Sequence, residues 1–277
     1  AYDCGGGLDT NAEPGPGTMT GSVDCTYGDN GTYGVSVEGT DKDGGSDSIG
    51  TDVDVVNVEP SIDAIDLASA TVEGAAGEQP ILVSFGDPGW EDTHEVNITW
   101  GDGESGPCDV TEAAGVGTAS CSHVWADNDL CGASPSHDDA CEVTVEVCDD
   151  DLDCATQSVG ITVANAAPEV VDASPSGAQE GLVSTVAISF VDPAGALDDP
   201  YTIDVDWGDG NADSYALSSG DYDGDPIDGA TFEARHIYSD DYDGTYGGCV
   251  EDSAELTICT VTVTATDKDD DAGQFVT

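Results

Sequence analysis

The tetrapeptide Trp-Gly-Asp-Gly occurs twice in this chain, at residues 100–103 and 207–210, each time at the same place in a longer ordered pattern. A Phe-x-Asp-Pro piece precedes each copy, and a histidine with an aromatic residue two positions later follows each copy. The preceding pieces are residues 85–88 and 190–193, and the following pairs are His123 with Trp125 and His236 with Tyr238. Two copies of so long a pattern indicate a tandem array of similar modules.

Short stretches with alternating apolar residues are spaced regularly along the repeat, and this period of two predicts half-buried β-strands. The predicted strands are 31–38, 53–56, a strand at Val72, 81–85, 96–100, 143–147, 159–163, 186–190, 203–207, 260–264 and 275–276. No stretch has helical spacing with capping residues. Short strands between Gly/Asp turns predict an all-β fold of tandem immunoglobulin-like sandwiches.

An Asn-x-x-Pro motif at residues 57–60 and again at 165–168 separates the modules. The distance from an aspartate turn to this asparagine is the same in both cases, since 57 − 41 and 165 − 149 are each 16. The predicted modules are 1–58, 59–165 and 166–277. The first reads as the closing half of a repeat, so its Trp-Gly-Asp-Gly half is expected upstream of Ala1. The third stops before another such motif, and its residues 213–234 read as an insertion.

The chain has ten cysteines, which divide two, six and two among the modules. An even number in every module favours disulfides within each module, and hence an oxidising extracellular compartment. Spacing alone does not decide the connectivity; nearest-neighbour pairing is the hypothesis adopted here. Its pairs are Cys4–Cys25, Cys108–Cys121, Cys131–Cys141, Cys148–Cys154 and Cys249–Cys259.

The charge is extremely acidic, with 59 Asp and Glu against three Lys and Arg and a net charge of −56. Nucleic acid is excluded as a partner, because the electrostatic contribution to such binding would be repulsive. No apolar run is long enough to cross a bilayer, which predicts no membrane insertion of this segment. Either calcium binding or a salty habitat explains the acidity. Because aspartates cluster in particular turns, calcium is favoured, although both can hold.

The ordered motifs resemble the PKD (polycystic kidney disease) repeat of extracellular proteins, in the form found in bacteria and archaea. The resemblance rests on the Trp-Gly-Asp-Gly turns, the His-x-aromatic pairs, the Tyr-x-Val-x-Val strand at 33–37 and the Asn-x-x-Pro motifs. It covers nearly everything from Tyr27 onward and implies an immunoglobulin-like sandwich. Two departures are Cys25, where the histidine would stand, and Trp125, where a tyrosine is usual.

Trp100 and Trp207 are expected to anchor the cores, with His123 and His236 as buried, hydrogen-bonded neighbours rather than metal ligands. The aspartates that follow the second strand and those that precede the last strand of a sandwich meet at one end of it. We therefore expect calcium sites there, with a solvated acidic rim as the alternative. The candidate ligands are Asp87, Asp92, Asp149, Asp151 and Asp153 near the first Asn-x-x-Pro motif, and Asp192, Asp198, Asp199, Asp267, Asp269 and Asp271 near the second.

No metalloprotease, hydrolase or phosphate-binding motif is present, so no enzymatic activity is predicted. The expected function is mechanical: a stalk, surface fibre, adhesin or filament. Its partners would be further repeats of the same chain or copies of itself, which could complete the first module by lending strands. The alternative is an accessory module of a secreted hydrolase that binds polysaccharide or a surface protein. Trp90, in a loop, is the candidate ligand-binding residue for that alternative.

Overall fold

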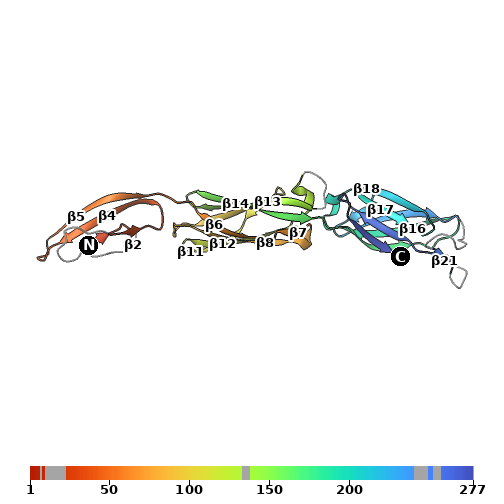
Figure 1. Cartoon of the computed structure of the whole chain (residues 1–277), viewed down its shortest axis with the longest axis horizontal. Coiled ribbons are helices and arrows are strands. Elements are labelled where there is room, and N and C mark those ends of the chain that lie inside the picture. The colour runs from red at the N-terminus through yellow and green to blue at the C-terminus, as the bar shows by residue number, and fades with distance from the viewer. Residues whose placement is uncertain (7, 10–22, 133–137, 240–248, 252–256, 277) are drawn as a thin grey trace.

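The computed structural model describes residues 1–6, 8–9, 23–132, 138–239, 249–251 and 257–276. These residues form three β-modules that follow one another in an extended row (Figure 1). The helical segments among them are three short 3₁₀ turns, η1 (Ala75–Gly77), η2 (Asn128–Leu130) and η3 (Gly195–Asp198). No helix in this described part is long and apolar enough to span a bilayer. The all-β prediction is confirmed.

The second module is a sandwich of two sheets with the orders β11-β12-β8-β6 and β10-β9-β13-β14-β7. Its strands are β6 (Ser61–Asp66), β7 (Ala70–Val72), β8 (Gln79–Gly86), β9 (His94–Thr99), β10 (Ser105–Pro107), β11 (Asp109–Ala113), β12 (Val116–His123), β13 (Asp138–Asp149) and β14 (Cys154–Ala164). Buried and exposed residues alternate along β9, as expected for a strand with one face on the core.

The third module repeats this plan with the sheets β15-β16-β20-β19 and β18-β17-β23-β24. Its strands are β15 (Glu169–Pro175), β16 (Val183–Val191), β17 (Tyr201–Asp206), β18 (Ala212–Leu217), β19 (Asp223–Asp225), β20 (Gly229–Ile237), β21 (Cys249–Glu251), β22 (Thr257–Cys259), β23 (Thr262–Thr266) and β24 (Ala272–Val276). The prediction of an insertion at 213–234 is wrong. Strands β18, β19 and β20 take the places of β10, β11 and β12, and longer turns between them hid the correspondence.

The first module contains β1 (Tyr2–Asp3), β2 (Leu8–Asp9), β3 (Cys25–Thr26), β4 (Gly31–Thr40) and β5 (Ser46–Val55). Its main sheet has the order β1-β4-β5, and β2 pairs with β3. Among the described residues the only other sheet of module 1 is the two-stranded β2-β3, and no strands equivalent to β6, β7 and β8 are present. The expectation that the first sandwich is incomplete therefore agrees with the structure.

The Trp-Gly-Asp-Gly turn of this module is nevertheless present in altered form, which corrects the expectation that it lies upstream of Ala1. Tyr2 pairs with Val37 just as Ile98 pairs with Val145, and both valines lie four residues before their aspartate turns. Cys4 therefore occupies the position of Trp100. Gly5 has a φ of 66°, and a Cβ atom there would lie 2.6 Å from the Gly34 carbonyl oxygen, just as one at Gly101 would lie 2.9 Å from that of Glu142. Replacement of Trp and Asp by Cys and Gly concealed the turn in the sequence.

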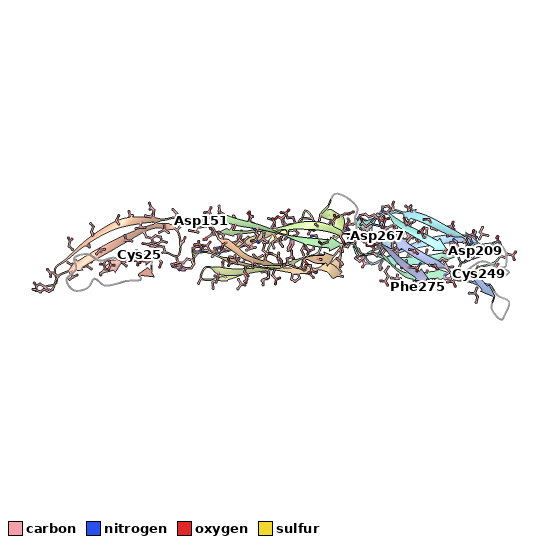
Figure 2. The ribbon with its side chains drawn as sticks, viewed as in Figure 1. Cys25, Asp151, Asp209, Cys249, Asp267 and Phe275 are labelled. Carbon is pink, nitrogen blue, oxygen red and sulfur yellow. A yellow bond between two sulfur atoms is a disulfide. The ribbon has the colours of Figure 1, made fainter. Side chains whose placement is uncertain are left out.

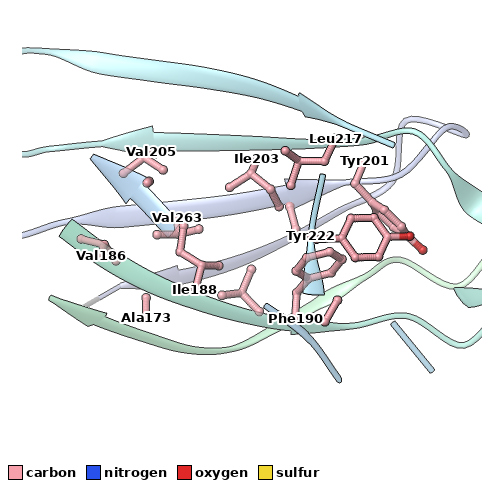
Figure 3. Close-up of a cluster of buried hydrophobic side chains, with 14 of the residues drawn as sticks. Ala173, Val186, Ile188, Phe190, Tyr201, Ile203, Val205, Leu217, Tyr222 and Val263 are labelled. Atoms are coloured by element: carbon pink, nitrogen blue, oxygen red, sulfur yellow. The ribbon is translucent and has the colours of Figure 1, made fainter. Parts of the chain in front are cut away.

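Each complete module has one apolar core between its sheets, and the Trp-Gly-Asp-Gly tryptophans lie in these cores as predicted. Figure 3 shows the core of the third module, where Ile203 and Val205 of one sheet face Ile188 and Phe190 of the other. His236 stacks on Trp207 with ring centroids 4.8 Å apart, and its Nε2 lies 2.9 Å from Asp209 Oδ2. In the second module His123 stacks on Trp100 in the same way.

The structure contains five disulfides, and no cysteine is free. They are the nearest-neighbour pairs expected from the sequence. Cys131–Cys141 and Cys249–Cys259 correspond between modules, since Cys141 and Cys259 both precede an aspartate turn by eight residues. Cys148–Cys154 closes the turn between β13 and β14.

Candidate metal centres at the two module joints

The joints between modules share one hydrogen-bonded arrangement, formed by a five-residue aspartate turn and the asparagine of the Asn-x-x-Pro motif. At the first joint, Asp149 Oδ1 accepts the backbone N–H groups of Asp151 and Asp153. The Asn57 side-chain amide donates to Asp149 Oδ2 at 2.7 Å and to Asp153 Oδ2 at 3.1 Å. The turn belongs to module 2 and the asparagine follows the last strand of module 1. This contact therefore ties the two modules together.

The second joint repeats this arrangement with module 3 supplying the turn. Asp267 Oδ1 accepts the backbone N–H groups of Asp269 and Asp271. The Asn165 amide donates to Asp267 Oδ2 at 2.9 Å and to Asp271 Oδ2 at 3.2 Å. Figure 2 marks the two joints with Asp151 and Asp267.

An acidic triad lies beside the turn of the first joint. Ligand oxygens of Asp87, Asp92 and Asp149 lie within 4.8 Å of one another, and all three residues are buried. Asp87 and Asp92 come from the loop after β8, and Asp149 ends β13, as the sequence predicted. Both carboxylate oxygens of Asp92 are buried without a hydrogen-bond partner. Burial, with Asp87 close by, raises the pKa of Asp92 to about 6.

His94 contacts this first triad from β9. Its Nε2 lies 3.3 Å from Asp87 Oδ2, and its Nδ1 lies 2.7 Å from Glu112 Oε2. Burial alone would lower the pKa of His94, but the two carboxylate hydrogen bonds outweigh burial and raise it. The imidazole therefore gives Asp87 a hydrogen-bond partner, whereas Asp92 has none among the described residues.

A second triad spans the second joint and joins two modules. Glu73 of module 2 meets Asp192 and Asp198 of module 3, and all three residues are at most 1% exposed. Glu73 accepts the backbone N–H groups of Asn128 and Ala166. Oδ2 of Asp192 and Oδ2 of Asp198 are buried without a hydrogen-bond partner. Burial is the main cause that raises the pKa of Glu73 to about 8 and that of Asp192 to about 7.

Lys268 supplies a positive charge between the modules at the second joint. Its Nζ donates to Asp127 Oδ2 at 2.9 Å and to Asp198 Oδ1 at 2.7 Å, and it lies 3.3 Å from Asp129. Burial opposes its charge, but the hydrogen bonds to Asp198 and Asp127 outweigh burial and raise the pKa of Lys268. Asp127, Asp129 and Asp269 form a third acidic triad around this lysine.

The first joint has no such cation among the described residues, because the position of Lys268 in the turn is taken by Asp150. Asp150 Oδ1 accepts the backbone N–H of Thr93 at 3.2 Å. Oxygen-only, carboxylate-rich clusters with unpartnered buried atoms suit a hard divalent cation such as Ca²⁺. The donor sets of the first two triads fit this ion. In the second triad the Lys268 ammonium already bonds Asp198 Oδ1, which leaves Oδ2 of Asp192 and of Asp198 without a partner. The third triad surrounds the same ammonium group.

Not every candidate ligand lies in a triad. Asp151 accepts from the Asn30 side chain, and Asp153 and Asp271 accept from the joint asparagines. Asp199 points away from the joint, because its carboxylate accepts from the Ser219 backbone N–H and the Tyr222 hydroxyl. The sequence contains two adjacent aspartates there, and only the structure shows that Asp198 is the one that turns inward.

Glu73, Asp127 and Asp129 belong to the joint triads and were missed by the sequence analysis. A signal for Asp127 was present in the sequence. An Asp-Asn pair follows Tyr27 at residues 29–30, and another follows Trp125 at residues 127–128, at the same distance from the aromatic residue. Glu73 had a signal too, because Glu-Gly recurs as Glu180-Gly181, and the Gly74 and Gly181 backbone N–H groups donate to the equivalent carbonyls of Trp125 and Tyr238.

Trp90 lies at the first joint, half-buried against module 1. A Cβ atom at Gly28 would lie 2.6 Å from the indole of Trp90, so glycine permits this close approach. The Glu91 backbone N–H also donates to Gly28 O at 3.0 Å. Trp90 therefore contributes to the contact between modules, and its role in ligand binding stays a prediction.

No protein-family model matches the chain, and no curated protein sequence matches it. Solved structures with some similarity include the Yersinia pseudotuberculosis adhesin InvE, at 13% identity and a TM-score of 0.33, over 76% of this chain and 57% of that one. The ectodomain of mouse nectin-like molecule 4 gives 12% identity and a TM-score of 0.27, over 77% of this chain and 62% of that one. Titin domains Z1Z2 in complex with telethonin give 12% identity and a TM-score of 0.31, over 80% of this chain and 95% of that one. The chain thus spans about three fifths of the first two structures. Similarities this low do not bear on function.

Proposed function

We propose that this chain is part of an extracellular structural or adhesive protein, a stalk or fibre of PKD-like sandwiches that calcium stiffens at the joints. The elongated row of modules, the five intramodular disulfides and the acidic surface support this proposal. Disulfides of this kind are typical of oxidising compartments outside the cytosol.

The observation that carries the proposal is the composition of the second triad. Its carboxylates come from two adjacent modules, and two of its buried oxygens have no partner. Carboxylates gathered in this way repel one another, and an ion bound among them would relieve the repulsion. Glu73, Asp192 and Asp198 would hold such an ion. Because these ligands belong to both modules, binding would restrict bending at the joint.

Small-angle X-ray scattering in calcium and in EGTA at equal ionic strength tests this stiffening. We expect a more rigid chain in calcium, and expect Glu73→Gln to remove most of the difference. Glu59→Gln, at an exposed position near the first joint, is the matched control. Identical scattering profiles in calcium and EGTA would reject the calcium-stiffened stalk.

A further inference from the structure

The main sheet of module 1 presents a face that is covered in the other modules. Val37 and Val53 are 41% and 36% exposed, whereas the equivalent Val145 and Ile161 of module 2 are 0% and 2% exposed. The equivalence follows from the turns, because Val37 and Val145 both lie four residues before the turn aspartate. In module 2 this face packs on the sheet β11-β12-β8-β6. Among the described residues of module 1 the two-stranded β2-β3 is the only other sheet, and strands equivalent to β8 and β6 are absent.

The outer edge of β5 is also free in this part of the chain. In module 2 the equivalent strand β14 pairs in parallel with β7, through Thr162 with Ala70 and Ala164 with Val72. Strand β5 ends its sheet and pairs only with β4 among the described residues. An open edge beside an apolar face is a site for strand addition.

The aspartate turn of module 1 has the same internal geometry as the two joint turns. Asp41 Oδ1 accepts the backbone N–H groups of Asp43 and Gly45, as Asp149 and Asp267 accept those of their own turns. Asp149 and Asp267 also accept a joint asparagine through Oδ2. Among the described residues no asparagine side chain donates to Asp41. The turn of module 1 is thus formed without a joint asparagine on it.

In module 2 a single continuous segment covers the aspartate turn, the apolar face and the sheet edge. It begins with the joint asparagine on the turn, and its strands then cover the face and the edge. In module 3 the equivalent segment covers the turn and the face. In module 2 this segment is residues 57–96, which end just before Asn97, the position equivalent to Ala1. The same turn and apolar face in module 1 therefore fit a segment equivalent to residues 57–96.

We propose that module 1 is a docking site for the opening half of another module of this repeat type. The partner segment carries Asn-x-x-Pro followed by strands equivalent to β6, β7 and β8. Its asparagine binds the Asp41 turn, and its strands complete the sandwich. This extends the proposed structural function, because each docked segment lengthens the row by one joint.

The first test adds a peptide of residues 57–96 to the full chain in EGTA and follows amide hydrogen exchange of β4 and β5. We expect exchange in these strands to slow at least tenfold, with modules 2 and 3 unchanged. Asn57→Ala in the peptide and Asp41→Ala in the chain should each weaken binding about tenfold. Working in EGTA keeps this result separate from the calcium proposal.

Matched variants locate the contact. Val37→Asp, on the exposed apolar face, should abolish the protection, and Ser36→Asp, on the opposite face of the same strand, should leave it unchanged. Protection that survives Val37→Asp would overturn the proposal. Sedimentation gives a second outcome that would overturn the proposal. If the chain forms a dimer that Val37→Asp dissociates and the peptide does not, the apolar face binds a second copy of the chain instead.

Because a free peptide can self-associate, a second arm joins a copy of residues 57–96 to the chain ahead of Ala1. The fused segment is then always present at high local concentration. We expect the same protection of β4 and β5 in this monomeric chain. Unprotected strands in the fused chain would overturn the proposal.

Discussion

Cys4 and Cys25 are bonded in module 1 at the two positions where modules 2 and 3 stack a tryptophan on a histidine. Cys4 corresponds to Trp100 by strand register, and Cys25 precedes Tyr27 as His123 precedes Trp125. Gly6 replaces the aspartate that holds the histidine elsewhere. Three residues thus differ from their counterparts in the other modules, and in module 1 a covalent link takes the place of the aromatic stack.

The aromatic stack should be important for stability in the complete modules. His123 stacks on Trp100, and its Nε2 lies 2.6 Å from the buried Asp102 carboxylate. We expect His123→Ala to destabilise module 2 by about 2–3 kcal/mol, because it removes the aromatic stack and leaves the buried Oδ2 of Asp102 without its partner. Chemical denaturation measures this. Glu104→Ala is the control, since Glu104 is exposed and 3.9 Å from the same ring. Equal effects of the two variants would contradict the assigned role.

The first triad predicts a calcium effect at one residue. Asp92→Asn removes a buried, unpartnered carboxylate, so it should weaken calcium binding at the first joint at least tenfold. In EGTA the same variant should melt at a higher temperature than the wild type, because the repulsion is reduced. Calorimetric titration and thermal melting test both parts. Asp63→Asn, at an exposed position, should change neither. A lower melting temperature of Asp92→Asn in EGTA would show that Asp92 has a partner in solution.

The raised pKa values predict how stability varies with pH when calcium is absent. In the folded chain the pKa is about 6 for Asp92, about 7 for Asp192 and about 8 for Glu73. In the unfolded chain the pKa of these carboxyl groups is about 4. Between these values the folded state binds more protons, so stability falls as pH rises from about 5 to about 8. Thermal melts in EGTA check this.

Calcium should reduce that fall, because a bound ion takes the place of the protons. The double variant Glu73→Gln with Asp192→Asn should also reduce it in EGTA. A melting temperature that rises between pH 5 and pH 8 in EGTA would contradict the predicted sign.

Two lysines at equivalent turn positions provide a matched pair of variants. Lys268 is half-buried among Asp127, Asp129 and Asp198, whereas Lys42 of module 1 is exposed beside Asp43. Lys268→Met should cost about 3 kcal/mol, because it leaves buried carboxylates without their cation. Lys42→Met should cost less than about 0.5 kcal/mol. Denaturation at low calcium measures both, and similar costs would show that Lys268 does not bridge the modules.

Trp90→Ala separates the joint role from ligand binding. Because Trp90 packs on Gly28, we expect the variant to increase hydrogen exchange around residues 27–30. We expect no change in pull-down by polysaccharide. Loss of polysaccharide binding with unchanged exchange would instead favour the accessory-module alternative.

The fold class could be read from the sequence, because it depends on local and repeated patterns, whereas the cysteine pairs were a hypothesis that the structure then agreed with. Alternation of apolar residues gave the strands, and two copies of one motif gave the module plan. The joint asparagines and their aspartate turns were also visible, since their spacing repeats. Module 1 was misread where Cys4 and Gly6 replaced Trp and Asp, because a motif search cannot see a turn whose side chains have changed.

The sequence by itself determined that this protein is a row of β-sandwiches whose aspartates gather at the joints. Only the tertiary structure decided which carboxylates are buried together, since Glu73 of one module meets Asp192 of the next although 119 positions (192 − 73) separate them in the chain. It also decided that Asp198 turns inward and Asp199 outward, and that Lys268 bonds acids of both modules at the second joint. Which of the clustered acids are buried together depends on contacts between modules, and sequence spacing alone does not specify those contacts.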